Sequence, residues 1–198
     1  MIDQNVLGPD CSGAALLVSG DHEAAYRITR NTVTCEDPTA DGIIVIGGLF
    51  SEGTVGAVVE KNNVTMHNSL FGGISLYGRV TGAYVGENTI EGDGAFALQA
   101  FGFSPANPTS ANRFQGNNIS HFTASVADVF FGPNTRDNVV MGDCSSVIDL
   151  GVNNFVTCGQ LTSGNLIGEE MATAHARKLE ALQRLTSVDR RPAVMTDR

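Results

Sequence analysis

One three-residue phrase returns along this chain, as Asn31-Thr32-Val33, Asn62-Asn63-Val64, Asn88-Thr89-Ile90 and Asn117-Asn118-Ile119. Counting a looser copy that begins at Asn5, successive asparagines lie 26, 31, 26 and 29 residues apart. Repetition at such a period indicates a solenoid, in which each repeat buries its apolar face only by stacking on its neighbours. Three more loose copies follow at shorter steps, so the last coils are irregular or one copy is a coincidence: Asn138-Val139-Val140, Asn154-Phe155-Val156 and Asn165-Leu166-Ile167.

Between the asparagine phrases lie short segments in which apolar residues alternate with others. Examples are Gly42-Ile43-Ile44-Val45, Gly73-Ile74-Ser75-Leu76 and Gly94-Ala95-Phe96-Ala97-Leu98. A period of two over this length predicts short strands with one buried face. A third apolar stretch in each repeat brings the expected number of strands to about three per coil.

These repeats resemble the right-handed parallel β-helix family, the pectate-lyase-like solenoids that carry asparagine ladders at one turn. The resemblance covers roughly residues 5–167. It implies an all-β fold, a right-handed parallel β-helix solenoid of about six coils over residues 1–168. Each ladder asparagine is expected to hydrogen-bond the equivalent amide one coil above or below, with Asn31, Asn62, Asn88 and Asn117 stacked at one turn.

The C-terminal segment has a different pattern. Residues 169–187 are rich in Ala, Leu, Arg and Glu without Gly or Pro, which predicts an α-helix that either caps the last coil or contacts a partner. Its apolar stripe is formed by Ala172, His175, Ala176, Leu179 and Leu182. Residues 188–198 are expected to be a flexible tail.

In the family that the chain resembles, binding and catalysis usually occur on the outer face of one sheet. If Ile43, Ile74, Leu76, Val129 and Leu150 point inward, alternation turns the neighbouring positions outward. The outward set then supplies Asp128 and Asp149 as a candidate catalytic pair of carboxylates. Tyr77, Gln99 and Phe130 are the candidate substrate-binding residues, since aromatic rings can stack on sugars. The alternative is an ordinary solvent-facing surface.

Two functions follow from this site, and whether the chain is an enzyme stays open. The first is a carbohydrate-binding or carbohydrate-active domain, of the lyase, hydrolase or epimerase type. The second is a non-catalytic structural or assembly module of a surface protein, fibre or scaffold. A groove lined by acids and aromatics favours the first function, and a flat outer face favours the second.

Net charge restricts the partners. The chain carries a formal charge of −9, and residues 1–168 hold 16 acidic and 6 basic side chains. An acidic body argues against nucleic acid and anionic membranes. No long apolar run predicts a membrane span. Polysaccharide remains the candidate partner, and a homo-oligomer formed through the solenoid ends or the C-terminal helix is left open.

Residues 1–5 do not read as a signal peptide, which fits a cytosolic protein or a piece of a secreted one.

No cofactor is expected. Acidic residues at two turns could suit Ca²⁺, but their spacing matches no Ca²⁺ motif, so calcium is only an alternative. These residues are Glu36, Asp37, Asp41, Glu91 and Asp93.

The four cysteines match no zinc motif: Cys11, Cys35, Cys144 and Cys158. Cys35 and Cys158 occupy the same repeat offset several coils apart, which predicts that they are not bonded to each other.

Overall fold

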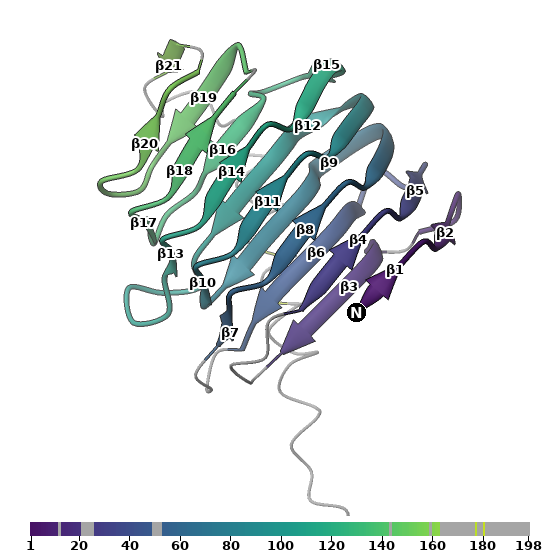
Figure 1. Ribbon diagram of the computed structural model, residues 1–198. Coiled ribbons are helices and arrows are strands. Elements are labelled where there is room, and N and C mark those ends of the chain that lie inside the picture. Colours follow the sequence, from purple (N-terminus) through teal and green to yellow (C-terminus); the bar gives the residue numbers. More distant parts are fainter. Residues whose placement is uncertain are drawn as a thin grey trace, which may run out of the picture.

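The computed structural model describes residues 1–11, 13–20, 26–48, 53–142, 144–158 and 160–162, together with Arg177 and Glu180. In this described part the strands form three sheets, of seven, four and ten strands. Figure 1 shows the strands stacked side by side in chain order, from purple β1 to yellow-green β21.

Each sheet collects one kind of segment from successive coils. The seven-stranded sheet contains, in spatial order, β1 (Ile2–Asp3), β4 (Arg27–Thr29), β8 (Val58–Glu60), β11 (Tyr84–Gly86), β14 (Arg113–Gln115), β18 (Val139–Met141) and β20 (Phe155–Val156). The four-stranded sheet contains β17 (Thr135–Arg136), β13 (Thr109–Ser110), β10 (Val80–Thr81) and β7 (Thr54–Val55). The ten-stranded sheet has a main path of β2 (Val6–Leu7), β5 (Thr32–Cys35), β9 (Asn63–Gly78), β12 (Thr89–Phe101), β16 (Val129–Phe131), β19 (Ser146–Asp149) and β21 (Gln160–Thr162). Three further strands pair beside that path: β3 (Ala14–Gly20), β6 (Asp41–Gly47) and β15 (Asn118–Ala124).

The pairings between these strands are parallel, and neighbours in a sheet come from successive coils. In the seven-stranded sheet, for example, Val59 pairs with Val85 and Val85 pairs with Phe114. Parallel pairing of segments about 30 residues apart requires the chain to return to the same edge after each coil. The arrangement therefore fits a parallel β-helix.

Aligned rows of apolar side chains fill the interior. One row of the ten-stranded sheet is Ile43, Ile74, Leu98, Val129 and Val147, and every member is buried in the main core. The predicted inward positions Ile43, Ile74, Leu76 and Val129 are thus confirmed, whereas Leu150 is partly exposed. Alternation along the strands puts the next row on the opposite face: Ile44, Ser75, Gln99, Phe130 and Ile148. This second row is buried as well, and its apolar members belong to two small clusters separate from the interior core.

The predicted asparagine ladder is present, and it begins one coil earlier, at Asn5. The side-chain amide nitrogens of Asn5, Asn31, Asn62 and Asn88 each donate to the Oδ1 of the next ladder asparagine at 2.9 Å, ending at Asn117. The same Oδ1 atoms accept the backbone N–H of the preceding asparagine. The amide of Asn62 also donates to the carbonyl of Ile28 at 3.0 Å, so its polar atoms are fully used in a buried site.

Each ladder asparagine follows a residue with positive φ. The φ values are 55° at Gln4, 53° at Arg30, 57° at Lys61, 56° at Glu87 and 65° at Gly116. A non-glycine residue in this left-handed conformation costs on the order of 1 kcal/mol. The ladder hydrogen bonds compensate for that cost, because each contributes about 1 kcal/mol net.

A second, shorter ladder runs along the corner between the four-stranded and seven-stranded sheets. Asn112 donates to Asn138, and Asn138 donates to Asn154, with 2.9 Å between amide nitrogen and Oδ1 in both cases. The phrases at Asn138 and Asn154 therefore are not irregular members of the first ladder. They belong to a different corner of the coil, which explains the short step from Asn117 to Asn138, whereas the step of 16 residues from Asn138 to Asn154 reflects a shorter last coil.

Two disulfides join neighbouring coils at the two ends of the stack. Cys11 is bonded to Cys35, with Cα atoms 5.6 Å apart, and Cys144 is bonded to Cys158, with Cα atoms 5.3 Å apart. The prediction that Cys35 and Cys158 are not paired is confirmed.

The fold-class prediction was wrong in one respect, because it included a C-terminal α-helix. The elements found in the described part of the chain are strands, and no helix is among them. Residues 169–187 lie outside the described residues, except for Arg177 and Glu180. Helix propensity is a weak local term that does not by itself establish a helix in this segment.

Candidate functional site

A polar cluster built around the carboxylate of Asp41 lies on the outer face of the ten-stranded sheet. Asp41 begins β6, Ser75 and Tyr77 lie on β9, and Gln99 lies on β12. Asp41, Ser75 and Gln99 are 0% exposed and Tyr77 is 1% exposed. The cluster therefore links three neighbouring strands and is shielded from water.

Hydrogen-bond donors surround one oxygen of this carboxylate. Asp41 Oδ1 accepts from the backbone N–H of Gly72 at 3.0 Å, from Gln99 Nε2 at 2.8 Å and from the hydroxyl of Ser75. The hydroxyl of Tyr77 lies 3.3 Å from the same oxygen. A buried carboxylate is tolerated only when such donors replace water.

Gln99 is the centre of the cluster. Its Nε2 lies 2.7 Å from the hydroxyl of Tyr77 and 2.8 Å from Oγ of Ser75, in addition to its bond to Asp41. Burial raises the pKa of Tyr77 well above its ordinary value of 10.0, and the negative charge of Asp41 raises it further. Tyr77 therefore remains a neutral phenol that can donate to the carboxylate.

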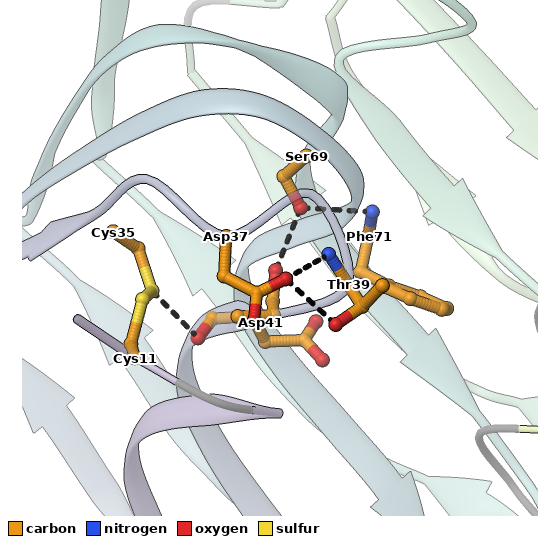
Figure 2. Close-up of a disulfide and its surroundings, with 8 residues drawn as sticks. Cys11, Cys35, Asp37, Thr39, Asp41, Ser69 and Phe71 are labelled. Atoms are coloured by element: carbon orange, nitrogen blue, oxygen red, sulfur yellow. Dashed lines mark hydrogen bonds between the residues drawn. A yellow bond between two sulfur atoms is a disulfide. The ribbon is translucent and has the colours of Figure 1, made fainter.

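The loop that leads into Asp41 is fixed by several contacts, drawn in Figure 2. The backbone N–H and the hydroxyl of Thr39 both donate to Asp37 Oδ1 at 2.7 Å, and Ser69 Oγ donates to the carbonyl of Ala40 at 2.7 Å. Sγ of Cys35, in the first disulfide, lies 3.7 Å from the carbonyl oxygen of Asp41. The disulfide and the loop together set the position of Asp41 against β9.

The two predicted catalytic carboxylates have separate partners. Asp128 Oδ2 accepts from Ser145 Oγ at 2.7 Å and from the backbone N–H groups of Ser145 and Ser146, and the side chain is 7% exposed. Asp149 Oδ1 accepts from the backbone N–H of Gly151 and from Asn154 Nδ2, both at 2.8 Å. The strand register pairs Asp149 with Phe131, three residues beyond Asp128, in a row whose other members face the interior core. The expectation that the two carboxylates are aligned on one outer surface is therefore corrected.

The three predicted substrate-binding side chains lie on the outer face as expected, but they are not accessible. Tyr77 and Gln99 belong to the Asp41 cluster, and Phe130 is 2% exposed. The Phe130 ring stacks on Phe96, with ring centroids 4.7 Å apart. Alternation gave the correct direction for these side chains, but it could not show that the outer face is itself covered.

The acidic groups considered for calcium do not converge on one point. Asp37 caps its own turn and Asp41 is enclosed in the cluster. Asp93 accepts from the backbone N–H of Asn68 at 2.8 Å and lies 3.7 Å from His67. Among the described residues, no three His, Cys, Asp or Glu side chains gather closely enough to hold a metal ion.

An aromatic side chain that is partly open to solvent lies instead on the outer face of the seven-stranded sheet. The ring of Tyr84 covers Gly86, because its Cζ lies 2.3 Å from where a Cβ of residue 86 would be. A Cβ at position 86 would therefore displace this ring. Phe155 occupies the same row three strands further on and is 59% exposed.

The Asp41 cluster was not identified from the sequence, where Asp41 was grouped with exposed acids. One signal was available: Ser75 and Gln99 are polar residues at equivalent positions of successive repeats, in a row otherwise occupied by apolar side chains. Polar residues aligned in this way indicate a shared partner, but the sequence does not reveal that Asp41 supplies it.

Comparison with known proteins found no matching family model, no similar curated protein and no similar solved structure. The resemblance to the pectate-lyase-like solenoids therefore rests on the repeat pattern and the parallel sheets alone. In the part of the chain that is described, no helix is long and apolar enough to cross a membrane.

Proposed function

We propose that this chain is a structural module, a rigid β-helix that acts as a scaffold or spacer within a surface protein, fibre or larger assembly. The observation that carries the proposal is the state of the predicted site. Tyr77, Gln99 and Phe130 are buried, and Asp128 and Asp149 each accept local hydrogen bonds. Side chains engaged in this way stabilise the solenoid.

The hydrogen-bonded ladders support the same proposal. The first ladder links five coils through buried amide bonds, and the second continues along another corner. Amide ladders and continuous parallel sheets both resist bending and shear, because each coil is hydrogen-bonded to the next along its whole length.

Disulfides at both ends of the stack favour an oxidising location for the module. Each disulfide is a covalent link between neighbouring coils and opposes their separation. Such bonds persist in extracellular or periplasmic compartments.

A turnover assay tests the structural assignment against a catalytic one. The disulfide-bonded protein is incubated with neutral and uronic-acid polysaccharides, and reducing ends and unsaturated products are measured. We expect no turnover. Turnover that is lost in both Asp128→Asn and Asp149→Asn, but kept in the exposed control Asp137→Asn, would contradict the proposal.

Carbohydrate binding without catalysis is the second candidate, and Tyr84 favours it. Its ring lies against Gly86, and the side chain is partly exposed. An aromatic face is the kind of surface on which the C–H groups of a sugar ring pack. Arg113 neighbours Tyr84 in the same row and is exposed, which adds a hydrogen-bond donor.

Affinity electrophoresis in gels that contain polysaccharide tests this second candidate. Retardation by at least one polysaccharide, lost in Tyr84→Ala and kept in the control Leu70→Ala, is the expected result if the face binds sugars. Equal migration of the unaltered chain and both variants in every gel would contradict this second candidate and leave the scaffold as the one remaining proposal.

A further inference from the structure

Two asparagine doublets place a buried and an exposed asparagine side by side. In Asn62-Asn63 and Asn117-Asn118, the first residue belongs to the buried ladder and the second is exposed. The sequence continues as Asn63-Val64-Thr65 and Asn118-Ile119-Ser120. Both triplets match Asn-x-Ser/Thr with x other than proline, the acceptor motif for N-linked glycans.

Strand alternation explains why the motif falls on the second asparagine of each doublet. Val64 and Ile119 are buried, so the residues on either side of them project to the outer face. A ladder asparagine, by contrast, is followed two positions later by an inward apolar residue. The buried asparagines and these followers are Asn31 with Val33, Asn62 with Val64, Asn88 with Ile90, Asn112 with Phe114, Asn117 with Ile119 and Asn138 with Val140.

The two amide nitrogens are available. Asn118 Oδ1 accepts from the hydroxyl of Ser120 at 2.7 Å and from its backbone N–H at 3.2 Å, which turns Nδ2 away from the strand. Within the described part of the chain, neither Asn118 Nδ2 nor the side chain of Asn63 makes a hydrogen bond. By contrast, the side-chain amide of the buried Asn62 is fully hydrogen-bonded.

The two acceptor sites also lie close together in space. Thr89 pairs with Asn63 on one side and with Asn118 on the other, so the two asparagines occupy one row, two strand spacings apart. That separation is roughly 10 Å. Glycans at both positions would cover the same part of the ten-stranded sheet, at the start of β9 and of β15.

We propose that Asn63 and Asn118 are sites of N-linked glycosylation. The donor is an oligosaccharide carried on a polyprenyl diphosphate, delivered by a transferase of the secretory pathway. The bond between the anomeric carbon and the diphosphate oxygen breaks, and a new bond forms between that carbon and Nδ2. Polyprenyl diphosphate leaves with the electron pair, and the amide proton passes to a base of the transferase. This modification goes beyond the scaffold function and does not depend on it.

Peptide mass spectrometry on the chain purified from its source tests the proposal directly. Peptide-N-glycosidase F in heavy-oxygen water converts a glycosylated asparagine to an oxygen-labelled aspartate. Labelled aspartate at positions 63 and 118 is the expected result. Unlabelled asparagine at both positions would overturn the proposal.

A second measurement separates the motif from general surface accessibility. The chain is directed through a eukaryotic secretory pathway and its glycosidase-sensitive gel shift is recorded. Thr65→Val and Ser120→Ala should each remove one of two shifts, while the conservative variants Thr65→Ser and Ser120→Thr should keep both. The absence of any shift in the unaltered chain, or a shift that survives in the Thr65→Val/Ser120→Ala double variant, would overturn the assignment.

Discussion

The first asparagine ladder and the Asp41 cluster are both buried polar structures, but they satisfy their polar atoms in different ways. The ladder repeats one side chain at one corner, so each amide finds an identical partner in the next coil. The cluster joins four different side chains from three strands around a single charge. Because the ladder repeats one contact, it can form with any number of coils. The cluster, by contrast, forms in only one arrangement of its strands.

This difference separates two effects: the ladder stabilises the stacking of the coils, and the Asp41 cluster fixes the register of the strands. A ladder would also form if a strand slipped by a whole coil, because every coil offers the same corner. The Asp41 cluster permits only one alignment of β6, β9 and β12, because Gln99 is the one glutamine and Tyr77 the one tyrosine on these three strands. Single buried polar groups are known to fix register in this manner.

Removing one amide from the middle of the ladder should have the largest effect. Asn62→Ala removes the acceptor of the Asn31 backbone N–H and side-chain amide, and it removes the amide donor to Ile28 and Asn88, all in a buried site. We expect a loss of about 4 kcal/mol in the free energy of unfolding. Asn63→Ala, at the exposed neighbouring position, is the control in protein produced without N-linked glycans and should change it by less than about 0.5 kcal/mol. Urea denaturation measures both values, and equal losses would mean that the ladder bonds do not stabilise the fold.

Opening the disulfide beside the cluster should have the next largest effect. Replacing Cys11 and Cys35 with alanine removes a link over a separation of 24 residues, which predicts a loss of about 3 kcal/mol. Because Cys35 contacts Asp41, hydrogen exchange should accelerate first at the amides of β6. Replacing Cys144 and Cys158 instead should accelerate exchange at β19 and leave β6 protected. Faster exchange at β6 in both variants would contradict this local coupling.

Gln99→Leu breaks the cluster without introducing a charge. The variant leaves Asp41 with fewer donors and removes the partner of Tyr77, so we expect a loss of about 2 kcal/mol in the free energy of unfolding. Gln115→Leu, on the seven-stranded sheet, is the matched control and should cost less than about 0.5 kcal/mol. Thermal unfolding monitored by circular dichroism compares the two. A smaller loss of stability in Gln99→Leu than in Gln115→Leu would show that the cluster does not stabilise the fold.

The smallest effect is a pH dependence that arises from Tyr77. Its pKa is raised in the folded state, so above pH 10.0 the unfolded chain ionises while the folded chain keeps the proton. Folded protein then binds more protons than unfolded protein, and stability falls by up to about 1.4 kcal/mol per pH unit from this group. Tyr77→Phe should remove that part of the slope in denaturation series measured below and above this pH. An unchanged slope would show that Tyr77 does not titrate as its burial implies.

Much of the fold was predictable because repetition is a property of the sequence itself. The spacing of Asn31, Asn62, Asn88 and Asn117 gave the ladder, and alternation around Ile43 and Ile74 gave the inward face. The second ladder was missed because Asn138 and Asn154 share the same short phrase with the first. A phrase of three residues does not specify which corner of a coil it occupies.

The candidate site was less predictable. Alternation placed Tyr77, Gln99 and Phe130 on the outer face correctly, but exposure depends on what packs against that face, and no local pattern encodes it. The separation of Asp128 from Asp149 depends on a three-residue offset in register, which the irregular length of the last coils concealed. The predicted C-terminal helix is not among the described elements, and propensity describes a segment only in isolation.

The sequence by itself determined the parallel stacking, the first ladder and the interior rows, because each follows from a period that the chain repeats. Only the tertiary structure decided that Asp41, Ser75, Tyr77 and Gln99 meet, that Cys11 bonds to Cys35, and that Asn63 and Asn118 are exposed. Those contacts join residues of different type from different coils, and they form only after stacking has brought the coils into register.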